Sequence, residues 1–289
     1  MATLNDFLFV YFFQLENELN TNWNGLDTIK FHSEEANTDE EVKLFFKAYI
    51  SANSRIKNDD IKRLIISRND NHQEINVEEL LAFNIANVLL PSELTSEMRN
   101  SIAASKRSVY TNPDLYMQIT NNDGIDNYIS IELKTTKNSQ IPGSSVQQVS
   151  PFEWVIFVKH TDRGEIDVTC GFYINSITER LPFPDRSPRP CISFDTLKKW
   201  NSIHRKLVND TLEYSINEDE EQNKAKILNN WEQVLCNEWL ETIENTPRQS
   251  EKWFNNTIRM FSLKLLKKVQ NSPEILNGLI NRLSKNVKG

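Results

Sequence analysis

Two stretches of alternating apolar and polar residues, joined by a turn-forming segment, constrain the fold of this chain more than any other feature. Residues 114–119 and 129–134 each place Ile, Leu or Met at every second position, which is the period of a β-strand with one buried face. Between them, Asn121-Asn122-Asp123-Gly124 is rich in residues that favour turns. The sequence therefore predicts a β-hairpin.

The register of this hairpin follows from the position of its turn. A turn centred on Asp123 places Asp114 opposite Glu132, and opposed side chains on one face of an antiparallel pair have Cβ atoms roughly 5 Å apart. Because side chains alternate between the two faces, Lys134 points to the same face as Glu132, whereas Leu133 points into the core.

Further strands and helices are expected around the hairpin. The apolar run over 152–158 is typical of a central strand, and residues 166–174 can pair with it in antiparallel fashion. The first hundred residues are expected to be mainly helical, and 181–190, with four prolines, to be a connector. Apolar residues at helical spacing, together with end signals, predict helices over 4–19, 76–90, 95–108, 194–209, 224–245 and 250–270. The fold class is therefore α/β or α+β, with a mixed central sheet and extra helices at both ends.

The composition excludes a disordered chain and a membrane-spanning one. Hydrophobic residues make up 38% and charged residues 25% of the 289 residues, and no apolar run approaches the roughly 20 residues of a spanning helix. Three cysteines at wide spacings favour free thiols in a reducing cytoplasm. The net charge is −7, but residues 246–289 hold nine Lys and Arg against two acids, so cations gathered on one surface could still bind a polyanion.

The two acids and the lysine of the hairpin are candidate catalytic residues. Carboxylates as close as Asp114 and Glu132 repel each other unless a cation lies between them, and their hard oxygens suit Mg²⁺. A Mg²⁺ ion with few protein ligands keeps water molecules and can polarise a phosphoryl oxygen. Lys134 would add a positive charge beside the phosphate. This combination indicates hydrolysis of a phosphodiester bond.

Pro113-Asp114 followed by Glu132-Leu133-Lys134 resembles the PD-(D/E)xK nuclease superfamily, and type II restriction endonucleases in particular, over about residues 76–174. The acid-x-lysine triplet alone is a weak signal, because Glu41-Val42-Lys43 and Asp60-Ile61-Lys62 also match it. Both of these are expected in helical stretches, whereas Glu132 ends an alternating strand that has Pro-Asp upstream. This context favours Glu132-Leu133-Lys134, rather than the other two triplets, as the candidate motif.

The resemblance implies a restriction-endonuclease-like fold for the middle of the chain. The PD-(D/E)xK core would cover 76–180, after an N-terminal helical region over 1–75 and before a C-terminal helical region over 181–289. The C-terminal helices are expected to pack on the core, so that the chain forms one compact domain overall.

The resemblance also implies roles for individual residues. Asp114, Glu132 and the carbonyl of Leu133 would bind Mg²⁺, and Lys134 would be the catalytic lysine. The substrate would be double-stranded DNA, cut to leave 5′-phosphates by an enzyme that is commonly a homodimer on a palindromic site.

The segment after Lys134 supplies candidate DNA contacts, because small and amide side chains can approach phosphates and groove edges. The candidates are Lys137, Asn138, Ser139, Gln140, Ser144, Ser145, Gln147 and Gln148. Alternatively, the segment is a strand-to-helix connection in which Ser144 or Ser145 caps a helix. Glu78, on the helix expected before the hairpin, is a candidate for a further acid.

Three functional hypotheses follow. The leading one is a restriction endonuclease of the bacterial cytoplasm that works together with a methyltransferase of matching specificity. The second assigns the same site to DNA repair or recombination, and the third is a non-catalytic DNA-binding protein. Discrete fragments of duplex DNA favour the first, nicks or cleavage confined to mismatches and junctions favour the second, and binding without a metal requirement favours the third.

Overall fold

The computed structural model contains two compact units, Met1–Asn229 and Asn230–Gly289. Among the residues that the structure describes, the first unit holds all the strands and the second contains three helices. The sequence predicted three regions, with C-terminal helices that pack on the core. This division into domains stays a prediction. The structure describes residues 2–29, 31, 40–69, 71–105, 113–145, 150–161, 163–178, 189–247 and 253–286.

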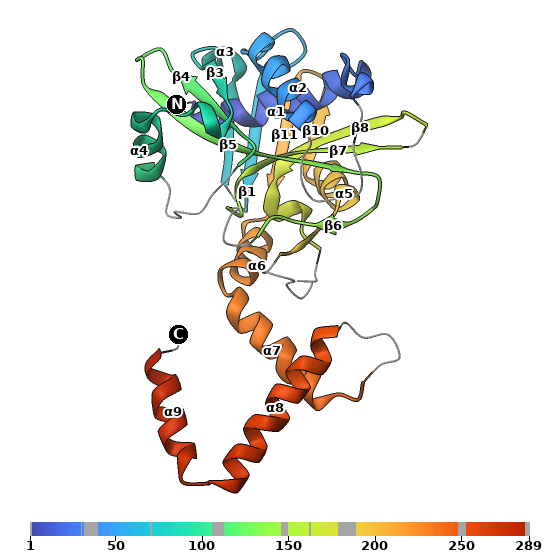
Figure 1. Ribbon diagram of the computed structural model, residues 1–289. Coiled ribbons are helices and arrows are strands. Elements are labelled where there is room, and N and C mark those ends of the chain that lie inside the picture. The colour runs from blue at the N-terminus through green and yellow to red at the C-terminus, as the bar shows by residue number, and fades with distance from the viewer. Residues whose placement is uncertain are drawn as a thin grey trace. The chain divides into compact units, whose positions relative to one another are not determined.

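The central sheet of the first unit is a mixed five-stranded sheet with the predicted hairpin at its centre (Figure 1). The hairpin strand β5 is antiparallel to β4 and parallel to β7, and the outer pairs β3–β4 and β7–β8 are antiparallel. The strands in spatial order are β3 (Asn84–Leu89), β4 (Leu115–Thr120), β5 (Asp126–Thr136), β7 (Trp154–His160) and β8 (Ile166–Phe172). The mixed sheet flanked by helices confirms the predicted α/β or α+β class.

The register of the hairpin agrees with the prediction. Tyr116 pairs with Ser130 and Gln118 pairs with Tyr128. Gly124 in the connecting turn has a φ of 73°, in the left-handed region that glycine adopts without steric cost. The strands predicted over 152–158 and 166–174 are also present and pair in antiparallel fashion.

A second sheet and a short strand pair complete the first unit. In the second sheet, β1 is parallel to β11, and β1–β2 and β10–β11 are antiparallel hairpins. Its strands in spatial order are β10 (Arg205–Val208), β11 (Thr211–Ile216), β1 (Arg63–Arg68) and β2 (Asn71–Asn76). The short pair is β6 (Ile141–Pro142) with β9 (Cys191–Ile192). None of these strands was predicted, and the expectation of a mainly helical N-terminal region was wrong for β1 and β2.

The helices confirm several predicted segments and correct others. Each segment predicted as helical contains at least part of a helix. The predicted helices over 76–90 and 194–209 are shorter than expected, and the one over 224–245 is divided between two helices. The α-helices are α1 (Leu4–Thr21), α2 (Glu40–Ala52), α3 (Val77–Leu80), α4 (Ser96–Ser105), α5 (Phe194–His204), α6 (Glu218–Asn229), α7 (Trp231–Glu244), α8 (Trp253–Asn271) and α9 (Ile275–Asn286). Short 3₁₀ turns are η1 (Leu26–Thr28), η2 (Pro91–Glu93) and η3 (Tyr173–Ser176).

The helix predicted from Asn76 shows why periodicity alone misleads. Asn76 does cap a helix, since its side-chain oxygen accepts a hydrogen bond from the Glu78 N–H at 3.0 Å. However, α3 ends at Leu80, and the chain continues as β3, in which Ile85 and Val88 are buried. Short apolar runs fit a helix and a strand equally well, and here hydrogen-bonded pairing with β4 makes this segment a strand. The helix predicted to end at Asn209 likewise ends at His204 and is followed by β10.

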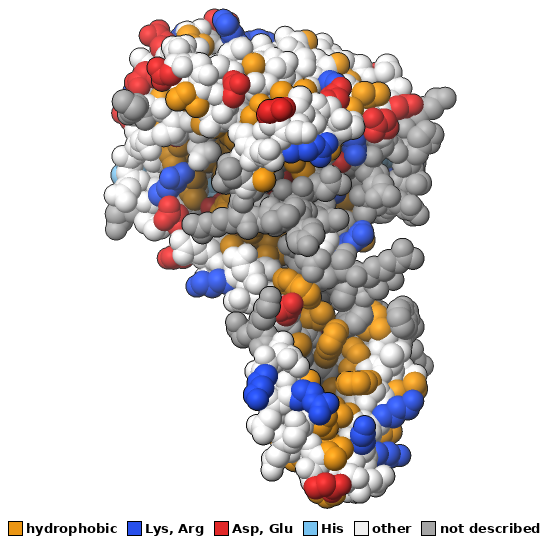
Figure 2. All heavy atoms as spheres, turned by 60° about the vertical axis from the view of Figure 1, so that its left-hand side comes forward, with side chains coloured by type: hydrophobic (Ala, Val, Ile, Leu, Met, Phe, Trp, Pro, Cys, Tyr) orange, Lys and Arg blue, Asp and Glu red, His pale blue; other side chains and the backbone are white. Residues whose placement is uncertain are grey.

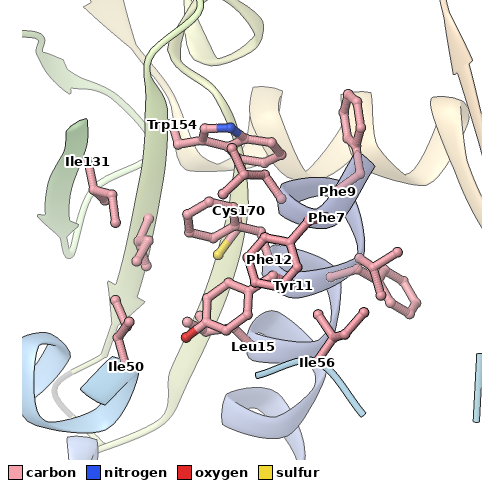
Figure 3. Packing of buried hydrophobic residues seen from close by; sticks show 14 of the residues in the cluster. Phe7, Phe9, Tyr11, Phe12, Leu15, Ile50, Ile56, Ile131, Trp154 and Cys170 are labelled. Carbon is pink, nitrogen blue, oxygen red and sulfur yellow. The ribbon is translucent and has the colours of Figure 1, made fainter. Parts of the chain in front are cut away.

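Helix α1 lies at the centre of the hydrophobic core and contacts both sheets (Figure 3). Phe12 stacks on Trp154 of the central sheet with ring centroids 4.3 Å apart, and Phe9 lies 4.5 Å from Tyr214 of the second sheet. Eleven of its residues are buried, as expected of a helix that is apolar on nearly all sides. Burial of α1 therefore joins the two sheets into one core.

A buried ion pair reinforces this junction. Glu16 of α1 pairs with Arg205 of β10, and both side chains are less than a tenth exposed. The other carboxylate oxygen of Glu16 accepts the Cys170 N–H of β8 at 2.7 Å. Burial lowers the pKa of Arg205, but the combined interactions with Tyr214 and Glu16 outweigh it, so the pKa is raised above its ordinary value. One side chain of α1 thus links a strand of each sheet.

The second unit has few buried apolar side chains among its described residues. Leu235 and Phe254 are buried, whereas Phe261 and Leu265 are 66% and 40% exposed. Figure 2 shows hydrophobic side chains gathered among Lys and Arg on this segment. The other exposed large hydrophobic residues of this unit are Leu240, Ile243, Met260, Leu263, Leu266, Leu276, Ile280 and Leu283. Among the described residues, no helix has both the length and the apolar character needed to cross a membrane.

The Glu16–Arg205 pair predicts the effect of a substitution. Arg205→Met leaves the Glu16 carboxylate buried without its cation, and we expect the free energy of unfolding, measured by urea denaturation, to fall by about 3 kcal/mol. Arg63→Met is the matched control, because Arg63 is half exposed and makes only surface ion pairs. Its effect should stay below about 1 kcal/mol. Equal effects of the two substitutions would contradict the assigned role.

Candidate active site

Asp114 lies directly before β4 and stays hydrogen-bonded to β5. Its N–H donates to the Ile131 carbonyl at 3.0 Å, one residue out of step with the ladder, in which Leu115 is opposite Ile131. The predicted pairing of Asp114 with Glu132 therefore stays a prediction. One oxygen of its carboxylate, Oδ2, accepts the Leu133 N–H at 2.8 Å, and the other, Oδ1, lies 2.8 Å from Lys43 Nζ. The carboxylate therefore sits at the end of β4 against the backbone of β5.

Glu132 and Lys134 form a buried ion pair on one face of β5. Lys134 Nζ lies 2.6 Å from Glu132 Oε1, and the side chains are 6% and 7% exposed. Their neighbours on β7 are Val155 and Phe157, which belong to a hydrophobic cluster. Buried charges are tolerated only when they are paired and hydrogen-bonded, so each of these two side chains holds the other in place.

Ser144 is a third member of this group. Its hydroxyl donates to the same oxygen of Glu132, and its N–H donates to the buried Tyr173 hydroxyl at 2.8 Å. The chain approaches closely at Gly143, where a Cβ atom would lie 2.1 Å from the Tyr173 oxygen. Only glycine fits at this position. Burial, followed by the negative charge of Glu132, raises the pKa of Tyr173 well above its ordinary value.

The structure thus forms two groups of contacts that meet at Leu133. Asp114 contacts Lys43 and the backbone of Leu133, whereas Glu132 contacts Lys134 and Ser144. Leu133 lies between Glu132 and Lys134 in the chain, so the two groups are adjacent along β5.

The remaining predicted residues lie in several environments. Lys137, Asn138, Ser139 and Gln140 are exposed on the loop after β5, and Ser145 is buried. Gln147 and Gln148 lie outside the described residues, as does the start of any helix that Ser144 or Ser145 would cap. Glu78 is exposed on α3, and the contacts described for the two groups above do not include it.

Lys43 is the residue of this site that sequence reasoning missed. It belongs to the triplet Glu41-Val42-Lys43, which was set aside as helical, and it does lie on α2. However, helix periodicity cannot show that its amine reaches Asp114, 71 positions further along the chain. The other rejected triplet, Asp60-Ile61-Lys62, was wrongly expected in a helix, because it leads directly into β1.

The donors at this site fit a small divalent cation. Among the residues that the structure describes, no group of three or more His, Cys, Asp and Glu side chains could hold a metal ion. Mg²⁺, however, usually takes only one or two carboxylates and completes its shell with water. The carboxylates of Asp114 and Glu132 and the carbonyl of Leu133 are hard oxygen donors of this kind.

Comparison of the chain with protein-family models, with curated proteins and with solved structures gives no significant match. The class that the structure itself defines is a mixed α/β protein whose mixed sheets are flanked by helices.

The buried pair on β5 predicts a difference between two lysines. Lys134→Met leaves Glu132 buried without its cation and should lower the free energy of unfolding by about 3 to 5 kcal/mol. Lys159→Met, on the neighbouring strand β7, removes a more exposed pair with Asp195 and should cost less than about 1 kcal/mol. Urea denaturation of the two variants tests this difference, and a Lys134→Met variant as stable as Lys159→Met would contradict it.

The raised pKa of Tyr173 predicts a loss of stability in alkali. The unfolded chain releases the tyrosine proton near pH 10, whereas the folded protein retains it. The resulting stabilisation is complete below pH 10 and is lost as the pH rises above 10 towards the folded pKa. Tyr173→Phe should therefore have a smaller decrease in unfolding free energy between pH 9 and pH 11 than the wild type. An identical pH dependence in both proteins would show that this hydroxyl is not the cause.

Proposed function

We propose that this protein is a Mg²⁺-dependent type II restriction endonuclease that hydrolyses phosphodiester bonds in double-stranded DNA and leaves 5′-phosphates. The observation that carries the proposal is that the Asp114 carboxylate accepts the N–H of Leu133, the residue between Glu132 and Lys134, which form a buried ion pair. This arrangement supplies two carboxylates and one amine at one strand end.

Each residue has a role in the proposed reaction. Asp114, Glu132 and the Leu133 carbonyl would hold Mg²⁺, which when bound would polarise the phosphate and acidify a water molecule. Lys134 orients the Glu132 carboxylate through the 2.6 Å contact. Its ammonium group would donate hydrogen bonds to the attacking water or to a phosphate oxygen and stabilise the charge that develops there.

The position of these residues within the sheet supports the proposal. Strand β5 has a neighbour on both sides, β4 and β7, so its backbone is fixed by hydrogen bonds in both directions. The turn that carries Ser144 is fixed by the Gly143 N–H, which donates to the Pro190 carbonyl at 2.7 Å. Catalytic groups act best when rigid elements and a supporting layer of hydrogen bonds hold them.

The proposal also names partners and a location. DNA would be contacted by the exposed loop residues Lys137 to Gln140, which directly follow the site. A homodimer agrees with the exposed apolar side chains of the second unit, because exposed apolar patches often mark protein interfaces. A restriction enzyme of the bacterial cytoplasm requires a methyltransferase of matching specificity, since the cell's own DNA carries the same sites.

Cleavage of a DNA of known sequence tests this function. We expect the purified protein with Mg²⁺ to cut phage DNA into discrete fragments and to lose at least about a thousandfold in rate on Lys134→Ala or Asp114→Asn. Lys159→Ala is the matched control and should cut at the wild-type rate, because Lys159 pairs with Asp195 rather than with the site.

Other outcomes would assign the protein to another class. Nicks, or cleavage only at mismatches and junctions, would favour a repair or recombination nuclease with the same site. DNA binding that needs no metal and is unchanged in Asp114→Asn, without any cleavage, would favour a non-catalytic DNA-binding protein. Cleavage that persists in Lys134→Ala would contradict the proposed chemistry.

A further inference from the structure

We propose that Lys43 is the counter-cation of Asp114 in the metal-free protein and that a divalent cation must displace it to bind. This inference rests on the proposed function, because it concerns the same carboxylate. It adds a residue from α2, on a separate part of the chain from the hairpin, and gives that residue a role in regulating metal binding.

The contacts of the Asp114 carboxylate lead to this inference. Lys43 Nζ lies 2.8 Å from Oδ1, and the Leu133 N–H lies 2.8 Å from Oδ2. The N–H is part of the β5 backbone and is fixed in place, so the lysine is the movable one of these two partners. A metal ion that binds Asp114 in place of a cation would therefore compete with the amine.

Helix α2 holds the backbone of Lys43 while leaving its side chain able to move. Val42, Phe46 and Ile50 are fully buried and fix the helix against the core that contains Leu133. The Lys43 side chain is 24% exposed, and its four-carbon stem has several rotatable bonds. The amine can therefore leave Asp114 without movement of the helix.

The charges at the site make the competition unavoidable. Without a metal ion, the ion pairs Asp114–Lys43 and Glu132–Lys134 are both electrically neutral. A divalent cation bound to Asp114 would lie within a few ångströms of Lys43, and like charges at such distances repel strongly in a partly buried site. The phosphates of DNA would offer the displaced amine a new partner, so metal ion and DNA are expected to bind cooperatively.

Calorimetric titration with Mn²⁺ in the absence of DNA tests the proposal. Lys43→Gln removes the competing cation and should bind Mn²⁺ at least about tenfold more tightly than the wild type. Lys43→Arg keeps the charge and should retain an affinity close to that of the wild type. Lys47→Gln is the matched control, because Lys47 lies one turn further along α2 and pairs with Glu93. Its affinity for Mn²⁺ should be unchanged.

The outcomes separate this inference from the proposed function. Equal or weaker Mn²⁺ binding by Lys43→Gln, with binding that is still lost in Asp114→Asn, would overturn the role of Lys43 and leave the metal site standing. Absence of any binding that depends on Asp114, in wild type and in Lys43→Gln alike, would overturn the proposed metal site itself.

A second measurement uses the wild-type protein, so that a misfolded variant cannot obscure the result. Acetylation of lysines by acetic anhydride, followed by mass spectrometry, reports how accessible each amine is. Saturation with Mn²⁺ should raise the labelling rate of Lys43 at least about threefold, with that of Lys47 as internal reference. A labelling rate of Lys43 that does not change on addition of Mn²⁺ would overturn the proposal.

Discussion

The pairing between β4 and β5 is the constraint on which the candidate site depends. Its register is set by the turn around Gly124, and it brings Asp114 beside β5, where the carboxylate accepts the Leu133 N–H. A shift of one residue would turn Glu132 and Lys134 to the other face of the sheet, towards the core around Leu133. The apolar alternation of both strands excludes that shift, so the pattern that buries Leu133 also sets the face on which the ion pair lies.

The surrounding structure serves to keep β5 rigid. Helix α1 is buried against both sheets, and the Glu16–Arg205 pair links them at a second point. On the opposite face of the central sheet, the turn at Gly143 brings Ser144 to Glu132. The carboxylates at the site are thus held by lysines, a hydroxyl and a backbone N–H. Charges arranged in this way are costly to bury unless they are paired and hydrogen-bonded.

Sequence reasoning succeeded where a pattern was local and failed where distant segments decide. The hairpin, its register, β7 and β8 follow from alternation and turn residues within about sixty positions. The local hairpins β1–β2 and β10–β11 were missed because their segments were assigned to helical regions. The parallel pairing of β1 with β11 could not be predicted, because the two strands lie about 150 positions apart. The same limit applies to Lys43, whose contact with Asp114 depends on the packing of α2. In β3, short apolar spacing fitted a helix equally well, and strand pairing decided the outcome.

The most direct test of the account is the position of a bound metal ion. A crystal of the protein soaked in Mn²⁺, with diffraction data collected at the manganese absorption edge, locates the ion without reference to activity. We expect one anomalous peak within roughly 2.5 Å of oxygens from both Asp114 and Glu132, beside the carbonyl of Leu133. A fully occupied peak elsewhere, or intact Asp114–Lys43 and Glu132–Lys134 pairs with no peak between the two acids at saturating Mn²⁺, would contradict it.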